Sequence, residues 1–580
     1  MLKQLAGCVR EYKRPTILTL IFIVGEAVIE TIIPFITANL VNRIKAGASI
    51  ESVMEVGLLL IIMAAISLVC GGLAGFTCAK ASTGFAKNLR SDLFHRIQTY
   101  SFENIDKFSS SSLVTRMTTD VTNVQMAFMM LIRIAIRSPL LLIFSTVMAF
   151  IMGGKLAFVF VVVIPILAIG LLAIGKKAMP AFRSVFKKYD RLNESIEENV
   201  RGMRVVKGFS REEYEKQKFN KAADNIRKDF TKAECIVALN TPLMNLCMYI
   251  NMVVVLLVGS KLAITSGGSA LDVGQISGML TYGMQILMSL MMLSMIYVMV
   301  TMSAESAKRI CEVLKEEPSL KEPEHPVMEV KDGSIEFKNV NFKYSAKAKK
   351  YALSGIDLSI RSGMTVGIIG GTGSSKSSLV QLIPRLYDVT EGAVLVGGVD
   401  VRDYDIPALR SAVAMVLQKN VLFSGTIKDN LRWGNETATD EEIMEACRLS
   451  QADEFIQTFP DKYDTYIEQG GSNVSGGQKQ RLCIARALLK KPKILILDDS
   501  TSAVDTKTDA LIRAGFKNYI PDTTKIIIAQ RIASVEDADL ILVMDNGSIS
   551  AAGTHEALLQ SSDIYREVYE QQTKGGKENE

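Results

Sequence analysis

The stretch GGTGSSKSS, residues 370–378, follows the apolar run MTVGII and precedes LVQLI. A buried strand, a glycine-rich turn and a helix start in this order are the setting of a phosphate-binding loop with the pattern G-x-x-x-x-G-K-[ST]. Gly370, Lys376 and Ser377 fit that pattern, but position 375 holds serine where the pattern has its second glycine. A Gly/Ser-rich turn could give a similar stretch, so this motif needs support from the rest of the chain.

A second stretch, ILILDDS at 494–500, is an apolar strand that ends in two acids, Asp498 and Asp499. This is the usual place for a Mg²⁺ ligand beside a phosphate-binding loop. Strand-like runs alternate with helical stretches in the second half of the chain, which predicts a parallel-sheet α/β domain. The expected strands lie at 334–344, 364–370, 493–500, 525–530 and 540–549.

Length and composition limit the classes of protein that remain. The chain has 580 residues, which is too many for one compact domain, and its net charge is only +5. No basic cluster with interleaved aromatic residues suggests a nucleic-acid partner. Eight cysteines are scattered without C-x-x-C spacing, so we expect reduced thiols and neither a disulfide framework nor a zinc site.

The apolar excess lies in the first half, where six segments are long enough to cross a bilayer, which takes about 20 residues each. Both long connectors between these segments and the N-terminus are rich in Lys and Arg, which favours the cytoplasmic side. We therefore expect a cell-membrane protein with its N-terminus and its soluble half in the cytoplasm. The segments fall roughly at 16–37, 54–76, 134–153, 155–175, 242–264 and 276–300.

The long connectors have helical periodicity and opposite charges at helical spacing, so we expect them to extend the membrane helices into the cytoplasm. A Pro-, Glu- and Lys-rich stretch then marks a linker. The predicted fold class is multi-domain: an all-α polytopic membrane domain of six transmembrane helices, followed by an α/β P-loop domain. The expected divisions are a membrane domain at 1–310, a linker at 311–333, a nucleotide-binding domain at 334–572 and a polar tail at 573–580.

Between the two phosphate-site motifs lies NVSGGQKQR, residues 473–481. Here the sequence resembles the ATP-binding cassette (ABC) family, because VSGGQ is close to the family signature LSGGQ. The stretches NVLFSGTIKDNL and AGTHEALL also resemble ABC exporters, and six membrane segments followed by one such domain is the half-transporter layout. The order of motifs matches as well: Tyr344, 370–377, Gln418, 474–478, Asp498, 500–505 and Gln530.

The resemblance implies ATP and Mg²⁺ as ligands and gives roles to individual positions. Tyr344 would stack on adenine, Ser377, Gln418 and Asp498 would serve Mg²⁺, and Asp505 would belong to the loop that follows the acids. The implied ATP-binding residues are Tyr344, Gly370, Gly371, Thr372, Gly373, Ser374, Ser375, Lys376, Ser377, Ser378 and Gln418. The signature, which acts on the ATP of a partner chain, would be Ser475, Gly476, Gly477 and Gln478.

Four positions depart from the family, and all four bear on hydrolysis. The family's water-polarising Glu is Asp499, its switch histidine is Gln530, its loop glycine is Ser375, and its Glu before the signature is Gln469. A glutamine amide can bond the γ-phosphate but cannot titrate like an imidazole. The chain therefore resembles the degenerate-site subunit of a heterodimeric ABC exporter, which binds ATP but hydrolyses it poorly and needs a second half-transporter chain.

The resemblance further implies that the two cytoplasmic loops end in short coupling helices, near 109–116 and near 200–209, that touch the nucleotide domains. An alternative function remains open, in which the chain is a regulator or a homodimer and ATP only locks a conformation. A neighbouring reading frame with the same layout, the intact Glu and His and an altered signature would favour the heterodimer.

The cargo is the least determined part of the function. Glu26 and Glu30 lie four residues apart in the first membrane segment, and intramembrane acids usually face a cavity or a partner. They would line a pathway for a cationic cargo, or they sit near an interface or pair with Arg133 or Arg137. We expect a small amphiphilic substrate, whether drug, lipid or peptide, and contact with membrane lipid.

Overall fold

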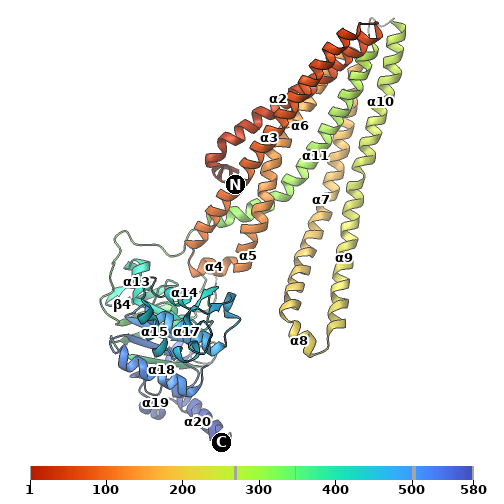
Figure 1. Cartoon of the computed structure of the whole chain (residues 1–580). Coiled ribbons are helices and arrows are strands. Elements are labelled where there is room, and N and C mark those ends of the chain that lie inside the picture. Colours follow the sequence, from red (N-terminus) through yellow and green to blue (C-terminus); the bar gives the residue numbers. More distant parts are fainter. Residues whose placement is uncertain (1, 267–270, 346–347, 500–503, 578–580) are drawn as a thin grey trace. The chain divides into compact units, whose positions relative to one another are not determined.

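The protein is described from a computed structural model over residues 2–266, 271–345, 348–499 and 504–577 (Figure 1). The chain divides into two compact units, which are described separately. The first contains residues 1–98 and 109–316, and the second contains residues 99–108 and 317–580.

The first unit consists of long helices (Figure 1). Its main helices are α2 (Lys13–Lys45), α3 (Ile50–Gln98), α6 (Val121–Gly153), α7 (Phe158–Arg201), α9 (Glu212–Ala238), α10 (Asn240–Thr265) and α11 (Val273–Lys315). Shorter helical pieces are α1 (Leu2–Gly7), η1 (Arg10–Tyr12), α5 (Ser110–Thr115), η2 (Arg116–Asp120), η3 (Gly154–Ala157) and α8 (Met203–Gly208).

Five helical stretches among the described residues are long and apolar enough to cross a membrane, so the expectation of six separate spans is corrected. One stretch, Ser110–Phe182, contains two of the expected segments. The connector η3 follows α6 directly and leads directly into α7, and this is why the two segments count as one stretch. Gly154, at the end of α6, has φ +51°, a left-handed value that favours glycine.

Small residues allow α6 and α11 to approach closely. A Cβ atom added to Gly153 would lie 2.5 Å from the Met279 sulfur, and one added to Gly278 would lie 2.6 Å from Met152 Cε. The two contacts are reciprocal: a glycine on each helix receives a methionine from the other. Small residues at such contacts are typical of helix packing in membranes, where close backbone approach replaces the hydrophobic driving force.

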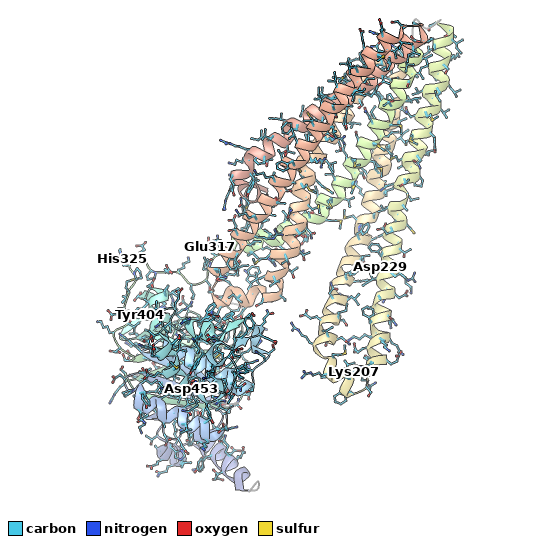
Figure 2. The ribbon with its side chains drawn as sticks, in the orientation of Figure 1. Lys207, Asp229, Glu317, His325, Tyr404 and Asp453 are labelled. Carbon is cyan, nitrogen blue, oxygen red and sulfur yellow. The ribbon has the colours of Figure 1, made fainter. Side chains whose placement is uncertain are left out.

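The expected helical extensions of the second long connector are present. Helices α7 and α9 run beside each other and are joined by α8 at the end of a long hairpin, where Lys207 lies (Figures 1 and 2). Along the hairpin, Asp229 of α9 accepts hydrogen bonds from Lys188 (2.7 Å) and Ser184 (3.0 Å) of α7. These bonds to two donors hold the pKa of Asp229 below its usual value.

The second unit is built around three sheets. The largest has the order β12-β11-β3-β10-β9-β6, in which every pairing is parallel except that of β11 with β12. Its strands are β3 (Thr365–Gly370), β6 (Val413–Val416), β9 (Ile494–Asp498), β10 (Thr524–Ile528), β11 (Leu540–Asp545) and β12 (Ser548–Gly553). A four-stranded sheet has the order β2-β1-β4-β5 and contains β1 (Ile335–Phe342), β2 (Leu353–Ile360), β4 (Glu391–Val396) and β5 (Val399–Asp400). The short pair is β7 (Gly425–Thr426) with β8 (Tyr466–Ile467).

The prediction of one parallel sheet is wrong for β1, which lies in the smaller sheet and pairs antiparallel with both β2 and β4. The physical reason is visible in burial. Every residue of β9 is buried, as in a parallel sheet covered on both faces, whereas β1 has buried and exposed positions mixed along its length. The other four expected strands are confirmed as β9, β10, β3 and β11 of the larger sheet.

Helices cover these sheets and complete the second unit. They are α4 (Phe102–Phe108), α12 (Lys376–Gln381), η4 (Val401–Asp403), α13 (Ile406–Ala412), α14 (Ile427–Arg432), α15 (Asp440–Leu449), α16 (Asp453–Ile456), η5 (Lys462–Asp464), η6 (Gln469–Gly471), α17 (Gly476–Leu489), α18 (Thr506–Tyr519), η7 (Ile532–Ser534), α19 (His555–Ser561) and α20 (Asp563–Lys577). Tyr404, after η4, is fully buried in this unit and donates a hydrogen bond to the Val396 carbonyl (Figure 2).

Candidate functional site

The candidate ATP site lies at the carboxyl edge of the larger sheet. Ile528 of β10 pairs with Ile368 of β3 and with Asp498 of β9, so three strands end at the same level. Strand β6 ends beside β9, with Val416 opposite Leu497. The segments that follow these four strands hold the phosphate loop, the two acids, Gln530 and Gln418. In open α/β sheets this edge is where ligands bind.

The phosphate loop has the backbone of a glycine-rich turn in spite of its serine. Ser375 has φ +70° and ψ +25°, in the left-handed region, and precedes α12. That conformation costs a residue with a Cβ atom about 1 kcal/mol. Gly373 has φ +86°, and a Cβ atom added there or at Gly371 would meet nothing within 4 Å. The loop therefore keeps an open, side-chain-free surface of the kind that phosphates need, at the price of strain at position 375.

Lys376 lies folded over this loop. Its ammonium group donates to the carbonyls of Gly370 (2.7 Å) and Gly371 (2.8 Å). Burial lowers the pKa of Lys376, and the nearby carboxylates of Asp498 and Asp499 act in the opposite direction. A phosphate bound in the loop would offer this cation a better partner than two neutral carbonyls.

The residues assigned to Mg²⁺ have the right chemistry for it. Ser377 Oγ donates to Asp498 Oδ1 at 3.0 Å, and the Asp498 side chain is buried. Burial is the main cause that raises the pKa of Asp498. Mg²⁺ takes oxygen ligands, keeps several waters and binds through few protein groups together with substrate phosphates. A hydroxyl and a carboxylate in contact at the end of a phosphate loop fit that donor set, with Gln418 exposed after β6.

Tyr344, expected under adenine, has 42% of its surface exposed. Its hydroxyl is within 2.7 Å of Ser378 Oγ, the last residue of the phosphate loop. The ring meets Tyr387 edge-on with centroids 5.1 Å apart and Phe342 at 4.8 Å. The tyrosine is thus fixed beside the phosphate loop and keeps exposed ring surface for a base.

Tyr387 was missed by the sequence analysis. Its hydroxyl donates to Asp106 of α4 at 2.7 Å, and its ring contacts Phe102. Helix α4 therefore belongs to the second unit, although it comes from the first long loop. The expected coupling segment at 109–116 contains α5 (Ser110–Thr115), which belongs to the helical unit, and its contact with the nucleotide domains stays a prediction. The expectation for 200–209 stays a prediction.

The two departures from the family's hydrolysis residues contact each other. Gln530 Nε2 donates to Asp499 Oδ2 at 2.8 Å. The Asp499 backbone N–H bonds the Ile528 carbonyl at 3.1 Å, and Asp499 has φ +47°, a left-handed value for a residue with a side chain. The carboxylate is therefore fixed by its backbone on one side and by the switch glutamine on the other.

The signature forms a well-made helix start. Ser475 precedes α17, its Oγ accepts from the Gln478 N–H (3.3 Å), and Gln478 Oε1 accepts from the Ser475 N–H (2.9 Å). Ser475 and Gly476 are exposed. Asp505 caps α18 in a similar way through the Thr508 N–H at 2.9 Å. Residues 500–503 of the expected loop lie outside the described residues.

In the helical unit, Glu26 and Glu30 of α2 both pair with Arg137 of α6. The Arg137 guanidinium is 2.6 Å from Glu30 Oε1 and 3.5 Å from Glu26 Oε1. Glu26 Oε2 is buried and has no hydrogen-bond partner among the described residues. The structure thus shows these two acids paired with Arg137, while a role for them in a cargo pathway stays a prediction.

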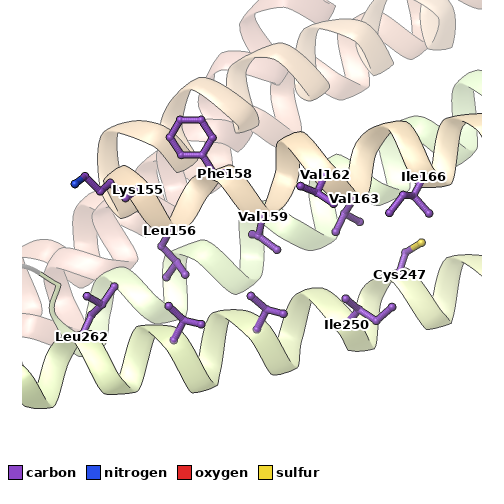
Figure 3. A pocket seen from close by; sticks show the side chains of 12 residues that line it. Lys155, Leu156, Phe158, Val159, Val162, Val163, Ile166, Cys247, Ile250 and Leu262 are labelled. Carbon is purple, nitrogen blue, oxygen red and sulfur yellow. The ribbon is translucent and has the colours of Figure 1, made fainter.

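An apolar cavity of about 490 Å³ lies between α7 and α10 (Figure 3). Lys155 lies at one end of the cavity and Cys247 at the other, and Val159, Val163 and Ile250 are among the apolar residues between them. Lys155 is the one charged side chain in the described lining. The described lining is thus apolar apart from one cation.

Comparison with known proteins agrees with this arrangement. Residues 16–290 match the family described as the ABC transporter transmembrane region, and residues 353–502 match the family described as ABC transporter. The chain is 36% identical over 555 residues to the uncharacterized ABC transporter ATP-binding protein YfiB of Bacillus subtilis (strain 168), covering 96% of each protein. It is 35% identical over 564 residues to the uncharacterized ABC transporter ATP-binding protein Rv1273c of Mycobacterium tuberculosis (strain ATCC 25618 / H37Rv), again covering 96% of each.

Among solved structures, the fold is similar to that of a bacterial Atm1-family ABC exporter with ATP bound. The TM-score is 0.82, the identity is 24%, and the match covers 96% of this chain and 98% of the other. At that identity the likeness shows a shared fold. Together with the relatives matched along nearly their whole length, it establishes that this chain belongs to the ABC transporter family and joins one transmembrane region to one ATPase domain.

Proposed function

We propose that this chain is the degenerate-site subunit of a heterodimeric ABC exporter. The observation that carries the proposal is the 2.8 Å hydrogen bond from Gln530 to Asp499. The aspartate is one methylene shorter than the family's Glu, which withdraws its carboxylate by about 1.5 Å. A misplacement of about 1 Å can cost 10²-fold in rate. The same carboxylate is also occupied by a side chain that cannot take up a proton as histidine does.

The residues expected to bind ATP keep the family's chemistry, unlike Asp499 and Gln530. Lys376 and the Ser377–Asp498 contact have the chemistry for phosphate and Mg²⁺, and the signature caps an exposed helix start. In the family, each ATP lies between the phosphate loop of one chain and the signature of the other. This chain would thus bind ATP at its own loop without cleaving it fast, and would give Ser475 to a competent site on its partner.

The cargo we propose is a small amphiphilic compound moved out of the cell. The apolar cavity between α7 and α10, with Lys155 in its lining, supports this class. The positive loops support a nucleotide domain on the cytoplasmic side of the cell membrane. Because Glu30 is already paired with Arg137, a cargo that depends on that acid alone is less well supported.

The test introduces at positions 499 and 530 the residues that the family has there. Purified alone, the chain should bind ATP and hydrolyse it very slowly, and Asp499→Glu combined with Gln530→His should raise turnover by on the order of 10²-fold. Adding Lys376→Ala to the restored variant should abolish the gain and serves as the control for contaminating ATPases. Fast turnover by the unmodified chain alone would refute the degenerate site.

Co-purification tests the partner. A second half-transporter chain should come down with this one, and the pair should hydrolyse ATP and move an amphiphile into inverted vesicles. A homodimer that binds ATP and changes conformation without transport would instead support the regulator alternative.

A further inference from the structure

We propose that Gln572, on the C-terminal helix α20, is a positioning residue for the chain's own ATP site. It holds the backbone of residues 530–532, which follows β10, and so fixes the side chain of Gln530 against Asp499. The inference rests on the proposed ATP-holding role of this site. It concerns the affinity for ATP and requires nothing about turnover.

The Gln572 amide bridges two backbone groups two residues apart. Its Oε1 accepts from the Ile532 N–H at 2.9 Å, and its Nε2 donates to the Gln530 carbonyl at 2.8 Å. Only one orientation of the amide satisfies both, because the N–H group needs an acceptor and the carbonyl needs a donor. The side chain therefore bonds the segment as a neighbouring strand would.

This segment needs such a partner. The bond from the Ala529 N–H to the Ile368 carbonyl lies at the end of the β10–β3 pairing, and η7 begins at Ile532. Residues 529–531 thus lie between the sheet and the next helical turn, which begins at Ile532. Without hydrogen-bond partners for its backbone groups, this segment would bond to water instead, and the Gln530 side chain would be held less firmly against Asp499.

A short path connects α20 to the phosphate edge. Gln572 holds the Gln530 backbone, the Gln530 amide holds Asp499, and Asp499 follows the Mg²⁺ candidate Asp498 directly. A change of Gln572 is therefore transmitted to the groups that face the γ-phosphate through two hydrogen-bonded contacts. None of these contacts involves the signature.

Helix α20 is anchored in a way that aims Gln572 at this segment. Tyr565 is fully buried and its hydroxyl lies 2.7 Å from His555 Nδ1, while Tyr569 packs against the same imidazole with centroids 5.2 Å apart. Residues at spacings of four and then three lie on one face of a helix, so 565, 569 and 572 share a face. Among the described residues, the Gln571 side chain bonds along its own helix, to Glu567 at 3.3 Å.

Gln571 is thus a matched control: the same residue type, on the same helix, without the bridge. Gln572→Met removes both hydrogen bonds and keeps the length and helix propensity of the side chain. We expect Gln572→Met in the full-length chain to weaken binding of a trinitrophenyl-ATP probe with Mg²⁺ by about threefold to tenfold, because each lost hydrogen bond is modest and partly solvent-exposed. Gln571→Met should leave binding unchanged.

A double-mutant cycle separates positioning from a general loss of stability. If Gln572 acts through the Gln530 side chain, Gln572→Met should add nothing to the loss caused by Gln530→Ala. Gln572→Glu keeps the acceptor for the Ile532 N–H but places a carboxylate oxygen against the Gln530 carbonyl, so its affinity should be at or below that of Gln572→Met. This second variant also decides the matter if Gln572→Met folds poorly.

Wild-type affinity in Gln572→Met, an equal loss in Gln571→Met, or additive losses with Gln530→Ala would each overturn the proposal. Rapid hydrolysis by the unmodified chain would refute the degenerate site but leave these affinity results standing, so the two failures are distinguishable.

Discussion

Gly370 and Gly371 are neighbours in the phosphate loop, and one methyl group added at each should have opposite consequences. At Gly370 the new Cβ would lie 2.3 Å from the Met544 carbonyl oxygen and 2.7 Å from Ser374 Oγ. At Gly371 it would meet nothing within 4 Å. Neither glycine has a left-handed backbone, so alanine is sterically compatible with the local conformation of both.

The expected changes in stability follow from these distances. Carbon–oxygen contacts normally lie at about 3.3 Å or more, so Gly370→Ala must push β3 and β11 apart by about 1 Å. Overpacking of this kind costs about 1–3 kcal/mol, and for a domain of this size that lowers Tm by about 2–12 °C. Gly371→Ala should change stability by less than about 0.5 kcal/mol. Its methyl group, however, occupies the surface that the phosphates approach, so ATP affinity should fall about tenfold or more.

The chain's one tryptophan, Trp433, gives the readout. It belongs to the second unit and stacks on Phe423 with centroids 4.4 Å apart, so its fluorescence follows the nucleotide domain within the full-length protein. Thermal unfolding followed by this signal, with nucleotide titration of both variants, separates the two effects. Equal destabilisation by the two alanines, or unchanged ATP affinity in Gly371→Ala, would refute the reasoning.

Other substitutions test the shared site and the membrane cluster. Ser475→Ala in this chain should lower the steady-state ATPase activity of the co-purified pair by about 10²–10³-fold, because Ser475 acts on the partner's ATP. Asp499→Asn should change this activity little. A large loss in Asp499→Asn with near wild-type activity in Ser475→Ala would place the working chemistry at this chain's own phosphate loop. Arg137→Ala should destabilise the helical unit by about 3–5 kcal/mol, since it leaves acids unpaired in the membrane, and an unchanged unfolding temperature in detergent would contradict the observed pairing. Glu26→Gln with Glu30→Gln should weaken transport of cationic compounds and spare neutral ones if these acids line the pathway; equal loss for both would indicate a structural role.

The local patterns of the chain predicted much of this protein. Apolar length predicted the membrane half, and the fully buried runs of β9 and β10 were recognisable as strands because a covered parallel sheet needs continuous apolar residues. The phosphate loop at 370–378 could be located from its spacing, since a strand, a glycine-rich turn and a helix start are all local features. Even the serine at 375 could be identified as a departure, although its left-handed backbone could not.

Tertiary structure decided what depends on pairing between distant residues. Spacing cannot show that Gln530 bonds Asp499 or that Gln572 bridges the segment after β10, and it left open whether Glu30 pairs with Arg137, which lies 107 positions away. Each of these contacts joins residues that lie far apart in the sequence, and local patterns do not choose between possible partners. The antiparallel pairing of β1 could not be predicted for the same reason. The residues of a strand indicate whether it is buried, but they do not indicate which strands it pairs with. The sequence determines local conformation through backbone and burial preferences, whereas contacts between distant residues exist only once the whole chain has packed.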